Sequence, residues 1–203
     1  ITVSVEDIKV GENATITVTV PKDATGQVLL DINGEQYYVN VNNGTGSVTI
    51  PRLPEGEYNV TASYSGDDKY LPSSNKTSFN VDKVDSFVKP VAQDIGVGDN
   101  EVITFTVPED ATGNLTVTVN GETYTVPVSG GKGTLTIPGL PKGDYTVEVK
   151  YNGDDKYKPS ENSTTFKVLR KSSTMDVTDL GNGTVVVDLP DNATGTVSIK
   201  VGN

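Results

Sequence analysis

The sequence predicts an all-β protein made of tandem two-sheet sandwiches, followed by a partial third sandwich. Three observations carry this prediction. The chain matches itself when it is shifted by 87 residues, its apolar residues alternate with threonine, and glycine-containing turns separate short strands. Repetition at this scale indicates an array of similar domains, which usually provides reach or multivalency rather than one catalytic pocket.

The repeat sets the expected domain boundaries. Residues 21–26 (PKDATG) recur as residues 108–113 (PEDATG), and 108 − 21 = 87. The same shift carries residues 64–70 (YSGDDKY) onto residues 151–157 (YNGDDKY) without a gap. A third copy of the first block begins at Pro190. We therefore expect one domain at 1–83, a second at 84–170, and the first three strands of a third at 171–203.

Strands are predicted from apolar residues at every second position, which is the period of a strand with one buried face. In residues 14–20 (ATITVTV), for example, the apolar residues alternate with threonine. We expect seven strands in the first unit and their equivalents 87 residues later in the second: 1–5, 14–20, 26–32, 35–41, 46–50, 57–64 and 77–82. The corresponding core positions of the third unit are expected at Val185, Val187, Leu189, Val197, Ile199 and Val201.

The turns point to a specific kind of sandwich. Asn33-Gly34 and Asn120-Gly121 each stand between apolar alternations, which is the strongest short signal of a β-hairpin. Seven short antiparallel strands in a unit of this length fit a sandwich of the immunoglobulin type. Tyr58 and Tyr145, each two residues before a core valine, are predicted to form tyrosine corners, in which the hydroxyl bonds to nearby backbone.

Composition excludes several classes of function. The net charge is −11 and no basic patch occurs, which argues against nucleic acid and anionic membranes as partners. The chain has no histidine and no cysteine, so the commonest general base and the thiol nucleophile are missing. We expect no enzymatic activity, no cofactor and no membrane insertion by this segment. Because the chain begins at Ile1 rather than methionine, we expect it to be a piece of a longer protein.

The acidic pairs of the repeated turns are the main candidate metal ligands. Calcium takes six to eight oxygen ligands, often from loop carboxylates and carbonyls. The preferred interpretation is that the first aspartate of each pair caps its turn and the second is solvated, with calcium binding as the alternative. The pairs are Asp67 and Asp68, and Asp154 and Asp155, with Glu6, Asp7, Asp82 and Asp85 near the domain ends as further donors.

Glycosylation is the strongest signal at the level of single sites. Eight Asn-X-Thr sequons occur, and all have threonine at the third position. They fall in turns or on outward strand positions, where a glycan would not disturb the core. The candidate residues are Asn13, Asn43, Asn59, Asn75, Asn114, Asn162, Asn182 and Asn192.

Residues 64–74 and 151–160 resemble the Y-x-G-D-x-x-Y-x-x-S hairpin of bacterial-type Ig-like repeats. The threonine- and asparagine-rich character is most similar to adhesin-like cell-surface proteins of methanogenic archaea. The resemblance implies an extracellular protein at the cell surface. It also implies that Tyr64 and Tyr151, the first tyrosines of the motif, have a structural role.

We therefore interpret the chain as a semi-rigid stalk, spacer or adhesion module, since its linkers at 82–86 and 169–173 lack flexible Gly/Ser runs. The expected partners are neighbouring repeats of the same protein and a glycan or protein on another cell. One alternative is a subunit of a filament or surface layer, whose partial third domain is completed by a strand from another chain. A second alternative is a carbohydrate-binding module, for which Tyr38 is the only obvious outward aromatic residue of the first unit.

Overall fold

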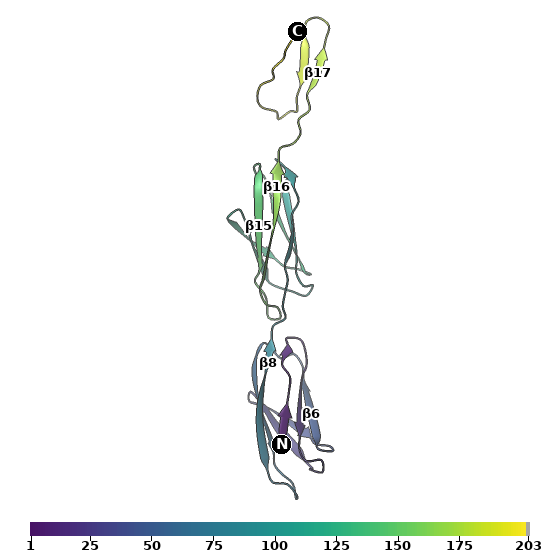
Figure 1. The fold of residues 1–203 in the computed structure, drawn as a ribbon, viewed down its shortest axis with the longest axis vertical. Helices are drawn as coiled ribbons and strands as arrows, with labels where there is room; N and C mark the ends of the chain where they lie inside the picture. The colour runs from purple at the N-terminus through teal and green to yellow at the C-terminus, as the bar shows by residue number, and fades with distance from the viewer. Residues whose placement is uncertain (202–203) are drawn as a thin grey trace.

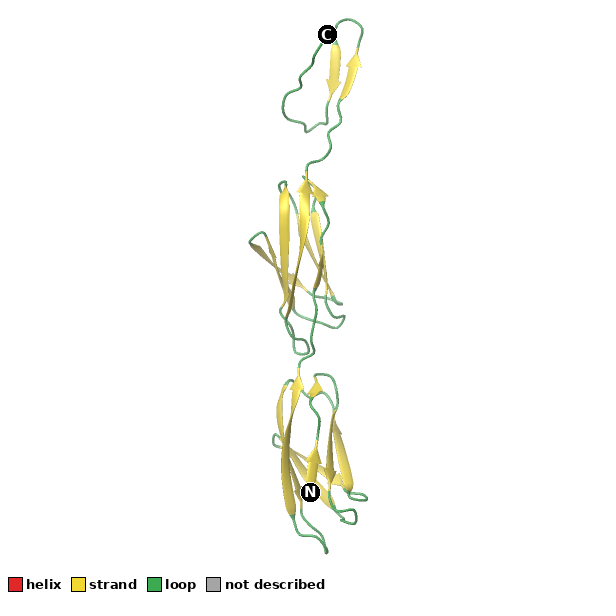
Figure 2. Cartoon of the chain, in the orientation of Figure 1, coloured by secondary structure: helices red, strands yellow, loops and turns green. Residues whose placement is uncertain are grey.

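A computed structural model describes residues 1–201 and shows two β-sandwiches stacked end to end, with a small two-stranded sheet beyond them (Figure 1). Every regular element is a strand (Figure 2). The predicted all-β class and the tandem Ig-like sandwiches are thereby confirmed. No helix in the described part of the chain is long and apolar enough to cross a membrane.

The first domain contains eight strands in two sheets. Its three-stranded sheet has the order β1-β3-β6, and its five-stranded sheet has the order β2-β8-β7-β4-β5. The strands are β1 (Thr2–Ser4), β2 (Ile8–Lys9), β3 (Ala14–Thr19), β4 (Gln27–Ile32), β5 (Glu35–Asn40), β6 (Thr45–Ile50), β7 (Gly56–Tyr64) and β8 (Ser73–Asp82).

The second domain repeats this topology strand for strand. Its sheets have the orders β14-β11-β9 and β10-β16-β15-β12-β13. The strands are β9 (Lys89–Val91), β10 (Ile95–Gly96), β11 (Glu101–Thr106), β12 (Asn114–Val119), β13 (Glu122–Pro127), β14 (Lys132–Ile137), β15 (Gly143–Tyr151) and β16 (Ser160–Leu169).

The predicted alternation places the core correctly in both complete domains. Ile16 and Val18 of β3 and Leu30 of β4 are fully buried, while the threonines between the β3 residues face outward or lie at the rim. Burying one such side chain contributes about 1.5–3 kcal/mol, so a Leu30→Ala substitution would be strongly destabilising. Leu115 of β12 occupies the position equivalent to Val28 and is also fully buried.

The Asn-Gly turns form hairpins as predicted. Asn33 and Gly34 have φ angles of 48° and 94°, the left-handed conformations that a tight hairpin turn requires. The Asn33 side chain also joins the hairpin to β7: its oxygen accepts from the Asn59 amide at 2.9 Å, and its nitrogen donates to the Glu57 carbonyl at 3.0 Å.

The prediction of seven strands per unit missed one short strand. Between β1 and β2 the chain crosses from the three-stranded sheet to the five-stranded sheet, where β2 pairs in parallel with β8. A strand of two residues carries no detectable period. The last strand also begins earlier than expected, at Ser73 rather than residue 77, because its polar first residues pair with β7 at an exposed edge.

Up to residue 201, the third unit forms two strands, β17 (Asp176–Asp179) and β18 (Val185–Asp188). The expected third strand over the last residues is not formed in the described segment, and Val197 and Ile199 are 41% and 56% exposed rather than buried. In the first domain the equivalent strand, β4, lies between β5 and β7. The described residues of the third unit contain neither of those neighbouring strands, so the core prediction for this unit was wrong.

Candidate functional site: the hairpin carboxylate and the domain junction

The hairpin between β7 and β8 is organised around one carboxylate. One oxygen of Asp67 accepts from the Thr25 amide at 2.8 Å, the Thr25 hydroxyl at 3.2 Å and the Tyr64 hydroxyl at 2.9 Å. The other oxygen accepts from the amides of Lys69 and Tyr70 at 2.9 and 2.8 Å. Asp67 therefore joins its own turn to the loop between β3 and β4.

The second domain has the same arrangement around Asp154. Its carboxylate accepts from the Thr112 amide at 2.8 Å, the Thr112 hydroxyl at 3.1 Å and the Tyr151 hydroxyl at 2.9 Å. The amides of Lys156 and Tyr157 complete the set at 2.9 and 2.7 Å. Tyr64 and Tyr151 thus contact the first aspartate of each acidic pair directly.

These hydrogen bonds stabilise the charged form of both aspartates. The Thr25 amide is the main cause that lowers the pKa of Asp67 well below its usual range. Burial would raise the pKa of Asp154, but the amides of Thr112, Tyr157 and Lys156 outweigh it and lower the pKa to about 2. Burial next to this carboxylate raises the pKa of the Tyr151 hydroxyl. Neither aspartate is suited to general acid or base catalysis near neutral pH.

A second contact explains why the two sequence blocks recur together. Asp110, in the repeated block 108–113, accepts from the Tyr157 hydroxyl at 2.6 Å and from the Lys156 ammonium group at 2.5 Å. Asp23 makes the same contacts with Tyr70 and Lys69 in the first domain. The PxDATG loop and the YxGDDKY hairpin are therefore two halves of one polar cluster.

The geometry does not favour calcium at these turns. Both oxygens of Asp67 and of Asp154 already accept hydrogen bonds from the protein. Asp68 and Asp155 are exposed, and no group of three or more acidic side chains suited to a metal occurs within residues 1–201. Three of the four candidate ligands near the domain ends are separately engaged: Asp7 accepts from the Asn80 amide at 2.6 Å, Asp82 pairs with Lys9, and Asp85 pairs with Lys158.

The linker between the two complete domains is bound to the hairpin of the second. Val84 forms a parallel bridge with Tyr157, donating its amide to the Lys156 carbonyl at 2.8 Å and accepting from the Lys158 amide at 2.9 Å. The Ser86 hydroxyl lies 2.6 Å from the Lys158 carbonyl oxygen and 2.8 Å from the Ser160 hydroxyl. The linker is consequently attached to the second domain through a β-bridge and side-chain hydrogen bonds rather than being a free tether.

Lys83 contacts both domains. Its ammonium group donates to the Asp154 carbonyl at 2.7 Å and lies 3.7 Å from the Glu55 carboxylate of the first domain. A groove with a volume of about 570 Å³ is open at this junction, where Leu53 and Pro54 of the first domain face Lys83 and Asp155. The junction is thus formed by side chains from both domains as well as by the linker.

Tyrosine corners hold the loops beside each junction. The Tyr58 hydroxyl donates to the Pro54 carbonyl at 3.0 Å, and the Tyr145 hydroxyl donates to the Pro141 carbonyl at 2.9 Å. The Tyr58 ring also stacks on Phe79, with ring centroids 5.3 Å apart. Since Pro54 precedes Glu55, the corner of the first domain positions the carboxylate that lies next to Lys83.

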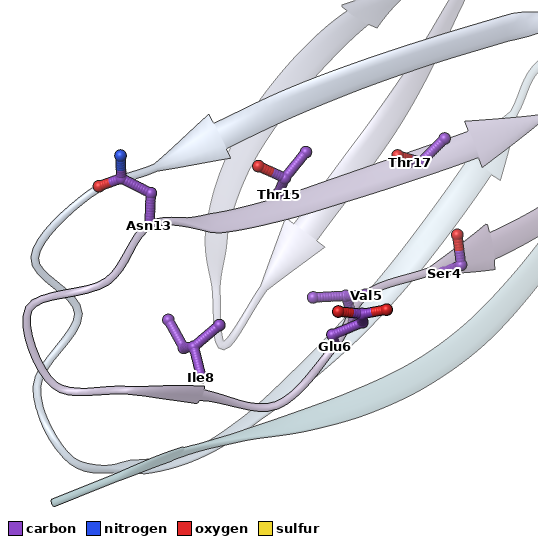
Figure 3. A pocket seen from close by; sticks show the side chains of 7 residues that line it. All are labelled: Ser4, Val5, Glu6, Ile8, Asn13, Thr15 and Thr17. Carbon is purple, nitrogen blue, oxygen red and sulfur yellow. The ribbon is translucent and has the colours of Figure 1, made fainter. Parts of the chain in front are cut away.

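The crossover between the two sheets leaves a pocket in each domain. In the first domain it has a volume of 440 Å³ between the Ser4–Ile8 segment and β3, where Asn13, Thr15 and Thr17 line it (Figure 3). The equivalent pocket of the second domain has a volume of 220 Å³. Its residue Glu101 replaces Ala14 of the first domain (14 + 87 = 101).

Glu101 was missed by the sequence-based prediction. It is only 1% exposed, one of its oxygens accepts from the Gln93 amide at 3.3 Å, and the other has no partner among the described residues. Burial raises the pKa of this carboxyl, and the nearby charge of Asp94 raises it further. The available signal was a charged residue at an inward position of the strand alternation.

All eight sequon asparagines are exposed. Two of them already use the nitrogen to which a glycan would be attached: Asn75 donates to the Ile1 carbonyl at 3.1 Å, and Asn162 donates to the Val88 carbonyl at 2.9 Å. These contacts secure the first strand of each domain. The side-chain nitrogens of the other six sequon asparagines make no protein hydrogen bond within the described residues. Glycosylation of the sequons remains a prediction, and these six sites are more accessible to a glycan than Asn75 and Asn162.

One family model matches most of the chain. The model described as "Bacterial Ig-like domain (group 3)" matches residues 1–82 and again residues 88–169. The chain belongs to this bacterial Ig-like family. Ig-like repeats of this kind are typical of surface and adhesin proteins and are typically non-catalytic.

The chain is similar to several solved structures at low sequence identity. The titin domains z1z2 in complex with telethonin are 13% identical, with a TM-score of 0.45 and coverage of 83% of this chain and 94% of that chain. Fibronectin(III)-like modules of Clostridium thermocellum CbhA are 16% identical, with a TM-score of 0.37 and coverage of 83% and 95%.

A putative membrane anchored protein from Corynebacterium diphtheriae is 18% identical, with a TM-score of 0.38 and coverage of 89% of this chain and 55% of that chain. A search of curated proteins gave no match. At these identities and scores the likenesses carry no argument about what the bacterial Ig-like repeats bind.

Proposed function

We propose that this chain is a semi-rigid spacer of a cell-surface, adhesin-like protein. The observation that carries the proposal is the junction, where Val84 and Ser86 of the linker bond to the second domain. Lys83 at the same time contacts Glu55 of the first. Three linker residues held in this way leave little freedom for a hinge, whereas a solvated tether would behave as a flexible coil.

The shape supports the same role. The two sandwiches lie along one axis, and the longest strands run along it (Figure 1). A strand such as β16, of ten residues, is about 33 Å long at a rise of about 3.3 Å per residue, so each repeat adds a few tens of ångströms of reach. A stack of such domains would hold a binding element away from the cell envelope.

The surface chemistry fits an extracellular location. The net charge is −11 and the eight sequon asparagines are all exposed, so an acidic and glycosylated exterior is part of the proposal. The proposed partners are neighbouring repeats, together with a glycan or protein of another cell. An archaeal source, suggested by the asparagine- and threonine-rich composition, belongs to the same proposal.

Distances between two spin labels, measured by pulsed electron–electron double resonance, can test the spacer directly. The chain has no cysteine, so Gln36→Cys and Thr123→Cys, at equivalent exposed positions of β5 and β13, introduce two unique labelling sites. We expect a narrow distribution of distances between the two spin labels. A distribution as broad as that of the same two domains joined by a Gly-Ser linker of equal length would contradict the proposal.

A filament or surface-layer subunit is the second candidate. It is favoured by the third unit, where Val185, Val197 and Ile199 are 37%, 41% and 56% exposed although their sequence pattern is that of a sandwich core. A strand from another chain would cover these residues. Sedimentation velocity over a range of concentrations tests this candidate, and a monomer at every concentration would reject it.

A carbohydrate-binding role has weaker support. Tyr38 is 67% exposed on the edge strand β5, but its equivalent in the second domain is Thr125 (38 + 87 = 125). A glycan array provides the test, with Tyr38→Ala as the matched variant. Binding that is lost in this variant would move this candidate above the spacer.

A further inference from the structure

The linker-binding surface of the second domain has an equivalent in the first. In the second domain the linker bonds to Lys158 through both the amide and the carbonyl, to the carbonyl of Lys156 and to the Ser160 hydroxyl. Subtracting 87 gives Leu71, Lys69 and Ser73 in the first domain. The Asp154 carbonyl, which accepts from Lys83, corresponds to that of Asp67.

The hairpin of the first domain has the shape needed for the same contacts. Its turn is closed by a hydrogen bond from the Asp67 amide to the Tyr70 carbonyl at 2.9 Å, which matches the Asp154–Tyr157 bond at 3.0 Å. Gly66 and Gly153 have similar φ angles of 83° and 78°. The carboxylate cluster described above is also the same in both domains. The backbone groups are therefore held in place before any partner binds.

The two hairpins differ in what covers them. Tyr157 is 8% exposed beneath Val84, whereas its equivalent Tyr70 is only half-buried and Leu71 is 87% exposed. Within the described residues, no group bonds to the Leu71 amide, while the equivalent amide of Lys158 donates to Val84. The first domain thus presents an organised but uncovered copy of a surface that the second domain uses.

We propose that residues 66–73 are a docking site for an extended segment with the chemistry of residues 83–86, supplied by another repeat of this kind. The segment has a basic residue, an apolar residue, any residue and a serine. The apolar residue would bond through its backbone to Lys69 and Leu71, and the serine to Leu71 and Ser73. The basic residue would donate to the Asp67 carbonyl, as in strand addition to an exposed edge.

The register of the repeat supports this occupant. Val88 lies two residues after Ser86 and corresponds to Ile1 of the first domain (88 − 87 = 1). In each domain the first strand begins at the next residue: β1 at Thr2 and β9 at Lys89. A segment docked on the hairpin would therefore lead directly into the first strand of the domain. The inference extends the proposed spacer function, since it makes the hairpin the part of every repeat that receives the preceding linker.

Amide hydrogen exchange of an extended chain provides the test. Lys-Val-Asp-Ser-Phe, the sequence of residues 83–87, is placed directly before Ile1 of the 203-residue chain. We expect exchange of the Leu71 amide to slow by about tenfold or more relative to the unextended chain. The matched control extension carries proline in place of the valine, which removes the donor to Lys69 and is expected to leave Leu71 unprotected.

Two outcomes would overturn the docking site: exchange at Leu71 that the extension leaves unchanged, or equal protection by the proline control. The Lys158 amide serves as the reference within the same molecule. If Lys158 is protected and Leu71 is not, the docking site is rejected and the spacer stands. If Lys158 exchanges freely as well, the junction itself is not formed and the spacer proposal fails with it.

Discussion

The Lys83 ammonium group lies 2.7 Å from the carbonyl oxygen of Asp154, the residue whose carboxylate organises the hairpin of the next domain. One aspartate therefore serves two purposes through different atoms. Its side chain holds the turn, and its backbone oxygen receives the linker. The conformation of the hairpin and the attachment of the linker to the second domain therefore both depend on Asp154.

Replacing Lys83 should loosen the junction without unfolding either domain. Lys83→Met removes the contact with the Asp154 carbonyl and the Glu55 carboxylate but keeps the length of the side chain. We expect a broader distribution of distances between spin labels on Gln36→Cys and Thr123→Cys. The free energy of unfolding should change by less than about 0.5 kcal/mol. Lys22→Met is the control, at an exposed lysine that forms no ion pair with residues 1–201. Equal distributions for the two variants would show that Lys83 does not order the junction.

The two aspartates of the second turn should differ sharply in their effect on stability. Asp154→Ala leaves the amides of Thr112, Lys156 and Tyr157 without their acceptor, so we expect a loss of about 2 kcal/mol or more. That corresponds to a melting temperature roughly 10 °C lower for a domain of this size. Asp155→Ala, at the exposed neighbour, should change stability by less than about 0.5 kcal/mol. Thermal unfolding followed by circular dichroism compares them, and similar losses would contradict the structural role of Asp154.

Glu101 should make the second domain less stable as the pH rises. Its pKa is raised in the folded state above the ordinary value of 4.5, so the folded state binds its proton more tightly. The resulting stabilisation is complete below about pH 4.5 and is lost as the pH rises through the raised value. We expect Glu101→Gln to reduce this pH dependence.

The first domain provides an internal control for Glu101, because Ala14 occupies the same position. Amide exchange at Val147 reports on the second domain and at Val60 on the first, both in core strands. Exchange at Val147 should quicken relative to Val60 between pH 4.5 and 8, after correction for intrinsic rates. A Glu101→Gln variant with the same pH dependence as the original chain would show that another group is responsible.

Calcium should leave the stability of the protein unchanged. The carboxylate oxygens of Asp67 and Asp154 are occupied by protein donors, and a cation would have to displace them. We expect the melting temperature to be the same in millimolar calcium and in excess chelator. A melting temperature that rises in calcium, and that no longer rises in the Asp67→Asn variant, would show that these turns bind the metal.

Much of the fold could be predicted because its signals are local. Alternation in residues such as Ile16 and Val18, and the Asn33-Gly34 turn, depend only on neighbours in the sequence. The partnership of Asp67 with Thr25 could not be found in this way, because the residues are 42 positions apart and only the fold brings them together. The repeat contained an indirect signal, since both blocks recur together.

The other differences also have physical causes. The two-residue strand β2 is too short to show a period and exists because β8 offers it a parallel partner. Glu101 was overlooked because the same strand position is an ordinary alanine in the first domain. In the third unit Val197 and Ile199 carry a core pattern, but burial depends on partner strands that the pattern does not supply.

The parallel pairing of β2 with β8 has a mechanical consequence. Ile8 is paired with Val81 and Lys9 with Asp82, so a strand near the start of the domain lies beside its last strand and runs in the same direction. Tension applied to the two ends of the domain pulls these strands past each other and loads their hydrogen bonds in shear. Bonds loaded in this way must break together rather than one after another. The hydrogen bonds between the short strand β2 and β8, and their equivalents in the second domain, thus resist extension of the repeats.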